Sequence, residues 1–455
     1  MPEKNFSEVT PYISSLADRC MTEGKIAPDL YTKFEVNRGL RDLQGRGVLT
    51  GLTEVSEINS FHEVNGERIP CEGELFYRGV NIKDIVKGAS DNGHNGFEET
   101  IFLLLFGHLP TMAELEEFSS VLGGYRSLPT SFVRDIILKA PSKDMMNVLA
   151  RSVLTLYTYD EYADDISLGN VLRQCLQLIS MFPLIAVYGY QAFVHYHDNQ
   201  SLFIHPAKAE LSTAENLLHI LRQDSQYTKL EAATLDMALI LHAEHGGGNN
   251  STFTNHVVTS SGTDTYSAMA ASLGSLKGPR HGGANIKVVH MFDDMKEHLT
   301  DWSDDGQIRA YLSDILDKKA FDGAGLIYGM GHAIYSVSDP RADVLKEYAR
   351  RLSEEKGLSE EYDLYRRTAK IASDLIAERR KIYKGVSPNV DFYSGFVYRM
   401  LGLPEELFTP IFAVARVAGW SAHRMEEIIN AGKIIRPAYR AVKERVEYVP
   451  MDKRG

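Results

Sequence analysis

Histidine and aspartate side chains lie in or beside four glycine-rich segments in the second half of the chain. His245 lies in LHAEHGGGNNSTF, His281 in KGPRHGGAN, His332 in YGMGHAIYSVSDPRADVLK and Asp391 in SPNVDFYSGF. Imidazole and carboxylate groups can transfer protons when their surroundings tune their pKa values. Glycine clusters mark places where the backbone turns tightly or approaches a ligand closely. Each residue alone also suits a structural role, and Asp391 in particular fits a helix N-cap.

A metal site is the first alternative that the residue types raise. His242 and His245 are three positions apart and can share one face of a helix. The sequence has no H-E-x-x-H motif, no cysteine-rich cluster and no third ligand near this pair,. The glycine-rich segments match neither the P-loop pattern nor G-x-G-x-x-G,. We therefore expect no metal ligands and no nucleotide site of the P-loop or Rossmann type.

Taken in order and with their flanks, the four segments closely resemble those of the citrate synthase family. The resemblance extends to LFYRGVNIKDI, FEE, LLLFGHLPT, ARVAGWSAH and the dipeptide Arg436-Pro437. It runs from about residue 70 to about residue 440, which is most of the 455 residues. It implies an acyltransferase of the tricarboxylic acid cycle that condenses acetyl-CoA with oxaloacetate and hydrolyses the thioester to citrate and CoA. Acetyl-CoA is then a substrate, and no cofactor is implied.

The resemblance also implies roles for three catalytic residues. Asp391 would remove a proton from the thioester methyl group, and neutral His281 would donate to the developing enol oxygen. His332 would polarise the oxaloacetate carbonyl and protonate its oxygen. Because an ordinary aspartate has a pKa of about 3.9 and is a weak base, we expect burial to raise the pKa of Asp391.

Binding residues follow from the same resemblance. Four positions match family residues that bind oxaloacetate, namely His245, Arg341, Arg416 and Arg436. Arginine suits this ligand because it grips a carboxylate with two parallel hydrogen bonds. The family usually takes the last arginine from the neighbouring subunit, so a homodimer is expected, with Arg436 completing the partner's site. Lys384 matches a position that binds CoA phosphate. Ser336 stands where relatives commonly have Lys or Arg for the same purpose.

The elements that position these residues read mainly as helices. Apolar residues recur at helical spacing in six stretches, which are Phe97 to Phe106, Met112 to Leu122, Leu230 to Leu241, Ala342 to Leu352, Tyr362 to Tyr383 and Pro410 to Ile429. Alternating patterns are confined to Ile58 to Glu67 and Gly73 to Val80, with a hairpin turn predicted at Asn65-Gly66,. We predict a mainly α fold with a small β element near the N-terminus.

Domain organisation is inferred from the glycine breaks and from the resemblance. Residues 1–281 and 393–455 would form a large helical domain that dimerises. Residues 282–392 would form a small mobile domain, with the site between the two.

Composition limits the partners. The chain has 49 basic and 61 acidic side chains, and a net charge of −12 argues against binding to nucleic acid or anionic membranes,. Leu176 to Tyr196 carries no Asp, Glu, Lys or Arg and is long enough to cross a membrane,. It contains Pro183 and Gly189, and no second such segment exists. We therefore predict a helix buried in a large core or at a subunit interface.

Cysteine usage and the N-terminus indicate the compartment. Cys20, Cys71 and Cys175 are odd in number and form no C-x-x-C motif, which is typical of a reducing environment,. The segment MPEKNFSEVT has no apolar or arginine-rich targeting character,. Cytoplasmic residence is expected.

Two other functions are compatible with the sequence. A 2-methylcitrate synthase would use propionyl-CoA, and one extra methylene changes discrimination by only about 1–3 kcal/mol. A chain without activity could instead act as a helical binding scaffold.

Overall fold

The chain forms two compact units, Met1–Leu52 and Thr53–Gly455. The computed structural model describes residues 7, 9–42, 46–64, 67–331, 335, 337–380, 386–430 and 432–454. The first unit contains α1 (Pro11–Gly24), α2 (Pro28–Lys33) and the 3₁₀ turn η1 (Arg38–Leu40). Thr10 caps α1 by accepting a hydrogen bond from the Ile13 amide at 3.3 Å,.

The second unit holds the remaining described helices. They are α3 (Ile82–Asn92), α4 (Gly96–Phe106), α5 (Met112–Gly124), α6 (Met145–Leu156), α7 (Leu168–Asp198), α8 (Thr213–Leu221), α9 (Lys229–His242), α10 (Asn250–Thr259), α11 (Thr265–Lys277), α12 (Ala284–His298), α13 (Asp305–Leu316), α14 (Pro340–Lys356), α15 (Ser359–Arg380), α16 (Val390–Met400) and α17 (Phe408–Asn430). Short turns are η2 (Val133–Ile137), η3 (Tyr157–Tyr159), η4 (Glu405–Leu407) and η5 (Met451–Lys453). All six helices predicted from periodicity fall on these elements, although Tyr383 lies outside the described residues.

Local sequence explains several helix starts. Thr111, Ser212 and Thr228 each form a capping box with the glutamate three residues on, at the starts of α5, α8 and α9. Such reciprocal bonds satisfy amides that the first helical turn leaves unpaired. The capping box at Thr228 therefore fixes where α9 begins, and α9 ends at His242, within the LHAEHGGGNNSTF segment.

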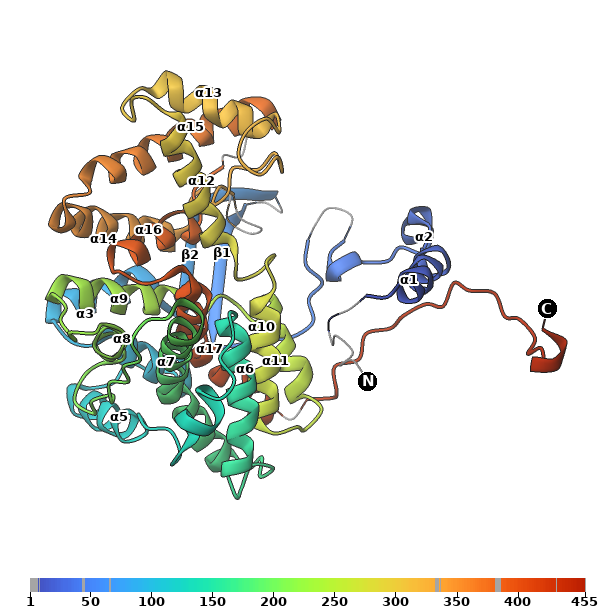
Figure 1. The fold of residues 1–455 in the computed structure, drawn as a ribbon, viewed down its shortest axis with the longest axis horizontal. Coiled ribbons are helices and arrows are strands. Elements are labelled where there is room, and N and C mark those ends of the chain that lie inside the picture. The colour runs from blue at the N-terminus through green and yellow to red at the C-terminus, as the bar shows by residue number, and fades with distance from the viewer. Residues whose placement is uncertain are drawn as a thin grey trace. The chain divides into compact units, whose positions relative to one another are not determined.

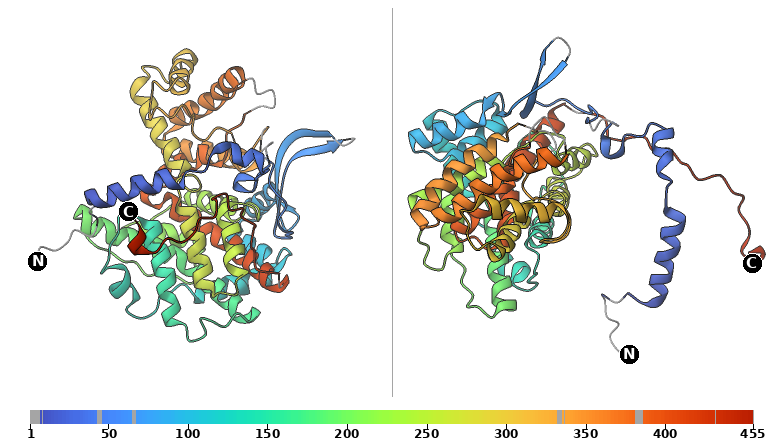
Figure 2. Two further views of the ribbon diagram at one scale, coloured as in Figure 1. Left: turned by 90° about the vertical axis from the view of Figure 1, so that its right-hand side faces the viewer. Right: turned by 90° about the horizontal axis from the view of Figure 1, so that it is seen from above.

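The β element is a three-stranded antiparallel sheet in the order β1 (Ser56–Val64), β2 (Glu67–Tyr77) and β3 (Val80–Asn81). Ser56 pairs with Tyr77, and the register shifts between Asn59 and Phe61. The β1–β2 ribbon projects from the helices of the second unit (Figure 2). The predicted turn at Asn65-Gly66 lies outside the described residues. The expected mainly α fold with a small N-terminal sheet is confirmed.

The uncharged segment noted in the sequence forms most of α7, a 31-residue helix with Pro183 inside it. By length and composition this helix could cross a membrane, but 78% of its apolar window is buried within the protein. It packs against α6, α8 and α17. The predicted burial is confirmed, and the contacts place the helix in the core, one of the two locations expected for it.

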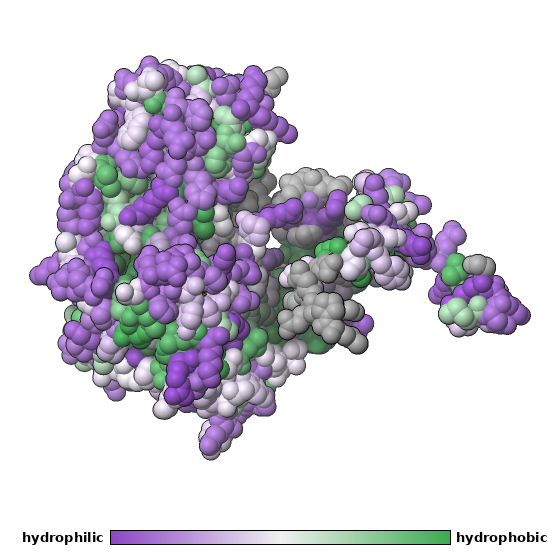
Figure 3. Space-filling model, viewed as in Figure 1, coloured by the Kyte–Doolittle hydropathy of each residue, from purple (hydrophilic) through white to green (hydrophobic). Residues whose placement is uncertain are grey.

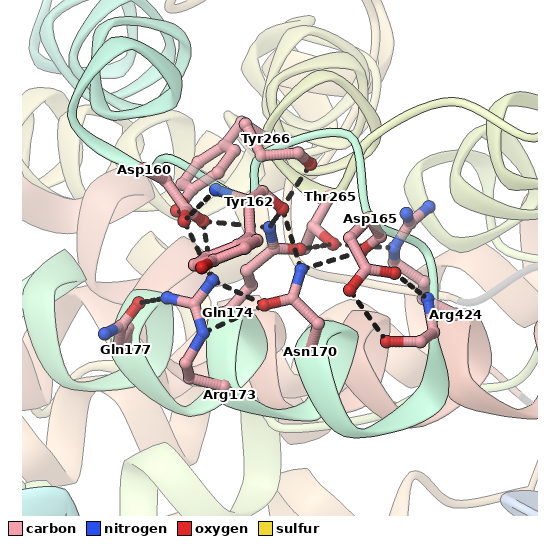
Figure 4. A network of polar contacts seen from close by, with 12 residues as sticks. Asp160, Tyr162, Asp165, Asn170, Arg173, Gln174, Gln177, Thr265, Tyr266 and Arg424 are labelled. Carbon is pink, nitrogen blue, oxygen red and sulfur yellow. Dashed lines mark hydrogen bonds and ion pairs between the residues drawn. The ribbon is translucent and has the colours of Figure 1, made fainter.

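A polar network holds α17 against α7 and α11 (Figure 4). The Arg173 guanidinium binds both oxygens of Asp160 at 2.8 and 2.9 Å. Gln174 donates to Asp160 at 2.9 Å and accepts from the Thr265 hydroxyl at 2.5 Å. Arg424 of α17 donates to Thr265 at 3.2 Å. These bonds fix the rotation of α17 about its own axis. The same helix carries Arg416, a residue of the candidate site.

Helices α12 to α16 gather at one end of the second unit (Figure 1). In the same view their surface is mainly hydrophilic, while larger apolar areas lie over the helices below them (Figure 3). Within this group α14 packs against α15 and α16, and α12 packs against α16. Helix α14 also contacts α3, α9 and β2, so it connects the group to the rest of the unit.

Candidate active site

Arg341 lies in the first turn of α14 and is held by a carboxylate two residues earlier. Asp339 caps the helix by accepting the Arg341 amide at 3.0 Å. It also binds the guanidinium through Nε at 3.0 Å and Nη2 at 2.8 Å. Both side chains are buried. Burial alone would lower the pKa of Arg341, but the carboxylate of Asp339 raises it above its ordinary value. The guanidinium therefore stays positively charged although it is buried.

Arg416 lies in the middle of α17 and is 1% exposed. Its Nε donates to the His242 carbonyl at 2.7 Å, and its guanidinium lies 4.7 Å from the centre of the Phe412 ring. Among the described residues the guanidinium makes this one hydrogen bond, so both Nη groups can meet a carboxylate ligand. Burial lowers its pKa to about 10 against the attraction of Glu244. The two arginines interact electrostatically with each other, as a site for a dianion requires.

Asp391 lies in the first turn of α16, one residue into the helix. The N-cap is Asn389, whose side-chain oxygen accepts the Asp391 amide at 2.9 Å. The N-cap role considered for Asp391 is therefore taken by Asn389, and the Asp391 carboxylate does not cap this helix. Burial raises the pKa of Asp391 to about 6, opposed by Arg341 and Arg416 and helped by Asp339. A carboxylate with this pKa is mainly ionised at neutral pH and is a stronger base than an exposed one.

Asn389 also ties α16 to the glycine-rich segment before residue 332. Its Nδ2 donates to the Gly331 carbonyl at 2.8 Å, and its amide donates to the Gly329 carbonyl at 2.9 Å. The Gly331 amide donates to Ser387 at 2.8 Å. Both glycines have positive φ, and a Cβ at Gly329 would lie 2.9 Å from the backbone of Phe392,.

His281 is held through one ring nitrogen. The Ser251 amide, in the first turn of α10, points at Nε2 from 3.3 Å, and the Ser251 hydroxyl lies 2.9 Å from the same nitrogen. A backbone N–H can only donate, so we assign Nε2 as unprotonated and Nδ1 as the donor. Burial, with a contribution from Arg416, lowers the pKa of His281 to about 4. The ring is therefore neutral at physiological pH.

His245 and His242 follow the end of α9. His245 is buried, with its ring centre 5.6 Å from that of Tyr335, and Arg341 lies 6.0 Å from the same tyrosine ring. His242 is also buried, and neither of its ring nitrogens has a hydrogen-bond partner among the described residues. Burial, Arg341 and Arg416 together keep the pKa of His242 well below its usual value.

Asp391 and His281 thus both feel the charge of Arg416, and Asp391 also feels that of Arg341. His332, Lys384 and Ser336 lie outside the described residues. Arg436 is exposed in the C-terminal segment, where the amide of neighbouring Ile435 donates to Ser260 at 3.0 Å. Its expected role in a partner's site stays a prediction.

Several residues of this arrangement were not singled out from the sequence. Asp339 and Asn389 were missed as helix caps that orient Arg341 and α16. On α17, Arg416, Trp420 and His423 recur at i, i+4 and i+7, a spacing that places them on one helix face,. Trp420 donates to the Ser251 hydroxyl at 3.2 Å and so supports His281. That helical spacing was the available signal for Trp420 and His423.

The metal alternative raised by the residue types depends on a third ligand beside His242 and His245. Among the residues that the structure describes, no group of three or more His, Cys, Asp or Glu side chains is placed to hold a metal ion.

The class that this fold and site define is a mainly helical protein with a half-buried carboxylate of raised pKa, a neutral imidazole and two buried arginines. Residues 42–438 match the family described as "Citrate synthase, C-terminal domain". Citrate synthase of Haloferax volcanii is 34% identical over 429 residues, covering 92% of this chain and 99% of that protein. The 2-methylcitrate synthase of Shewanella oneidensis is 32% identical, covering 80% of this chain and 87% of that protein.

Solved structures agree. Citrate synthase from Thermotoga maritima superposes with a TM-score of 0.70 at 28% identity, covering 92% of this chain and 99% of that one. A ternary complex of carboxymethyl coenzyme A and oxaloacetate with citrate synthase from Thermoplasma acidophilum gives a TM-score of 0.73 at 26% identity, covering 92% and 100%. The chain belongs to the citrate synthase family and is an enzyme of the acyltransferase type.

Proposed function

We propose that this site condenses acetyl-CoA with oxaloacetate and releases citrate and CoA. The observation that carries the proposal is the pairing of a base with a neutral donor. Asp391 has its pKa raised to about 6, and His281 has its pKa lowered to about 4. Above about pH 6, the Asp391 carboxylate is ionised and can accept a proton while the neutral His281 imidazole donates a hydrogen bond. Enolisation of a weak carbon acid needs both groups at once.

The steps follow from these states. The Asp391 carboxylate takes a proton from the thioester methyl group, and the electron pair of the broken C–H bond moves toward the thioester oxygen. His281 Nδ1–H stabilises that oxygen, a contribution of roughly 10²–10³ in rate for one well-placed donor. The enol carbon then attacks the ketone carbon of oxaloacetate, whose oxygen takes a proton from His332 by resemblance to the family. Water finally cleaves the citryl thioester.

Substrate binding rests on the arginines. Arg341 and Arg416 supply a local positive field in a chain of net charge −12, and oxaloacetate carries two carboxylates,. His245 flanks the same tyrosine as Arg341, which supports a role at this ligand. We assign Lys384 to a CoA phosphate by the resemblance alone.

A homodimer with Arg436 supplied in trans is part of the proposal. Arg436 is exposed in a C-terminal segment whose described residues, 432–450, form no helix or strand. A mixed-subunit test is direct. Equimolar mixing of inactive Asp391→Asn with inactive Arg436→Leu should regain activity in the heterodimer, because one of its two sites then holds neither change. No regained activity after subunit exchange would contradict shared sites.

Mobility of residues 282–392 against the rest is likewise proposed; because residue 392 lies inside α16, that whole helix would move with α12 to α15. Residues 53–455 form one compact unit, and at α14 the described polar contacts with the large part include a hydrogen bond from the Thr228 hydroxyl to Glu355 at 2.8 Å. Lys83 binds Asp343 at 3.2 Å, Lys356 binds Glu231 at 2.6 Å, and Gly73 donates to Ser338 at 3.1 Å. Closure would exclude water and protect the thioester intermediate.

Cytoplasmic residence is proposed on cysteine usage. The three cysteines are free, with Cys20 exposed, Cys71 half-buried and Cys175 buried. This pattern suits a reducing compartment.

The acyl substrate has a second candidate, because relatives of both names match at similar identity. Initial rates with oxaloacetate plus either acetyl-CoA or propionyl-CoA decide between them, with CoA release and product mass as readouts. We expect the higher kcat/KM with acetyl-CoA. A higher value with propionyl-CoA would establish 2-methylcitrate synthesis, and release with neither would favour the scaffold function.

The same assay tests the base. Asp391→Asn should abolish condensation and leave oxaloacetate binding measurable by calorimetry. Asp343→Asn is the matched control, because Asp343 lies in the first turn of α14 in a solvent-exposed pair with Lys83. Near wild-type turnover in Asp391→Asn would refute the assignment.

A further inference from the structure

A recess of about 370 Å³ opens where β1 begins and β2 ends. It is lined by the start of β1 and the residues before it, by the turn between β2 and β3, and by the residue that ends α4. The polar lining residues are Thr53, Glu54, Ser56, Glu57 and Arg78. The proposed mechanism uses none of them. The volume lies at the lower end of the range for small-molecule sites, so the recess is sized for a small metabolite.

Arg78 supplies a positive charge whose direction is fixed. The side chain is half-buried, and its Nε donates to the Leu104 carbonyl in the last turn of α4 at 3.0 Å. Within the described part of the chain the guanidinium makes no other hydrogen bond and no ion pair. Both of its Nη groups are therefore available for the two parallel hydrogen bonds with which arginine grips a carboxylate.

Two carboxylates line the same recess without neutralising Arg78. Glu54 and Glu57 are exposed, and neither side chain forms a hydrogen bond or an ion pair with any residue that the structure describes. An ion pair requires the charged atoms to lie within about 4 Å, so the opposite charges stay apart in the recess. A ligand with only a carboxylate would be repelled by the glutamates, and one with only an amine by the arginine. A ligand that carries both groups complements both signs.

Hydroxyl groups and open glycines complete the lining. Thr53 Oγ1 accepts a backbone amide at 3.1 Å, so its O–H is available to donate. Ser56 Oγ donates to Glu244 Oε1 at 3.0 Å, so its lone pairs are available to accept. Gly79 and Gly107 have positive φ, and a Cβ on either would meet no heavy atom within 4 Å. The glycines therefore leave room for a ligand beside the charged groups.

The walls of the recess are bonded to the segment that carries His245. Ser56 holds the side chain of Glu244, which precedes His245 in the sequence. Tyr77, which precedes Arg78, is buried, and its hydroxyl lies 3.0 Å from the Glu244 carbonyl oxygen. A ligand bound to Ser56 and Arg78 would therefore restrain both supports of Glu244.

We propose that this recess binds a free α-amino acid, which acts as an effector of oxaloacetate binding. Arg78 binds the carboxylate, and Glu54 and Glu57 bind the ammonium group. The effector role rests on the binding role proposed above for His245, whereas the amino-acid site does not. Because the occupied recess already holds Glu244 in place, less ordering is left for oxaloacetate to impose, and oxaloacetate affinity should rise. By linkage, oxaloacetate should raise the amino-acid affinity by the same factor.

The first test is calorimetric titration of the full chain with each standard L-amino acid in turn, at millimolar concentrations and without substrate. At least one amino acid should bind. Its N-acetyl derivative and its amide should each bind at least about tenfold more weakly, because each lacks one of the two charges. Binding by no amino acid would overturn the proposal, as would equal binding by either derivative.

Variants of the lining residues locate the bound ligand. Arg78→Gln removes the positive charge, while the new amide can still donate to the same carbonyl of α4. The double variant Glu54→Gln with Glu57→Gln changes only exposed positions, so it should fold. Each protein should bind the amino acid at least about tenfold more weakly. The matched control is Glu116→Gln with Glu117→Gln, an exposed pair on α5 outside the recess, which should bind like wild type. Unchanged affinity in the Glu54 and Glu57 double variant would overturn the proposal.

Oxaloacetate affinity tests the effector role. Calorimetry with saturating amino acid should give an affinity for oxaloacetate at least about fivefold higher than without it. Ser56→Ala removes the bond to Glu244 and should reduce this factor. An unchanged oxaloacetate affinity would overturn the effector role. Because the amino-acid titration uses no substrate, binding in a protein that fails to condense acetyl-CoA with oxaloacetate would refute the proposed function and uphold this site.

Discussion

The fall in rate at acid pH offers the sharpest prediction, because the pKa values of two groups at the site are shifted in opposite directions. Asp391 must be ionised to act as a base, and burial places its pKa at about 6. His281 must be neutral, and its pKa is about 4. At saturating oxaloacetate, kcat/KM for acetyl-CoA should therefore be near its plateau at about pH 7 and fall about tenfold per pH unit below about 6. Below about pH 4 the slope should double, because both groups are then in the wrong state.

Thioester loss, followed by ultraviolet absorbance, gives this profile without relying on a thiol reagent that fails in acid. Asp339→Asn should move the limb to lower pH, because Asp339 raises the pKa of Asp391 while Asn keeps the N-cap acceptor of α14. Asp343→Asn, an exposed acidic position of the same helix, should leave the limb unchanged. A profile that is flat between about pH 5 and about pH 7 would show that Asp391 is not the base with the pKa the structure indicates.

The same raised pKa has a consequence for stability. Folded Asp391 binds its proton more tightly than the unfolded chain does, so ionisation destabilises the fold. The penalty is absent below about pH 4 and complete above about pH 6,. From 3.8 to about 6 it amounts to about 3 kcal/mol at most, and partial solvent exposure should halve it to about 1.5 kcal/mol,. Urea unfolding should therefore find inactive Asp391→Asn more stable than wild type at neutral pH and equal to it in acid. Equal stability at both pH values would refute a half-buried, ionised Asp391 carboxylate.

Three further changes test the supports of the site. Ser251→Ala removes the hydroxyl near His281 Nε2 but keeps the backbone donor, so kcat should fall about tenfold with little change in the KM for oxaloacetate; a KM effect alone would contradict this. Asn389→Ala removes a helix cap and a tie to the glycine segment, and chemical denaturation should show a loss of about 1–2 kcal/mol,. Gly419→Ala places a Cβ 2.4 Å from the Ala243 carbonyl, and the melting temperature should fall by several degrees, whereas an unchanged value would mean that α17 is free to shift,.

Much of the fold could be predicted because it depends on local pattern. The apolar stripe from Leu230 to Leu241 predicts α9 to within a residue at each end, since Thr228 and Glu231 supply a capping box. The small sheet was found because alternation and helical spacing differ in period. The surroundings of the long helix α7 were less clear, since a uniformly apolar run does not say which neighbours cover the helix.

Residue types and their order already indicate which chemistry this chain can perform. The four glycine-rich segments and their flanks were enough to indicate a base, an imidazole donor and carboxylate-binding arginines. Charge states could not be predicted in the same way, because desolvation and neighbouring charges depend on packing. The pKa values of Asp391 and His281 move in opposite directions because burial penalises the charged form of each group,.

The contacts that hold the site together also depend on packing. Two contacts join residues more than 160 positions apart, that of Trp420 with Ser251 and that of His423 with Glu244. No local pattern specifies such pairs, because only the packing of α17 against α9 and α10 brings them within hydrogen-bonding distance.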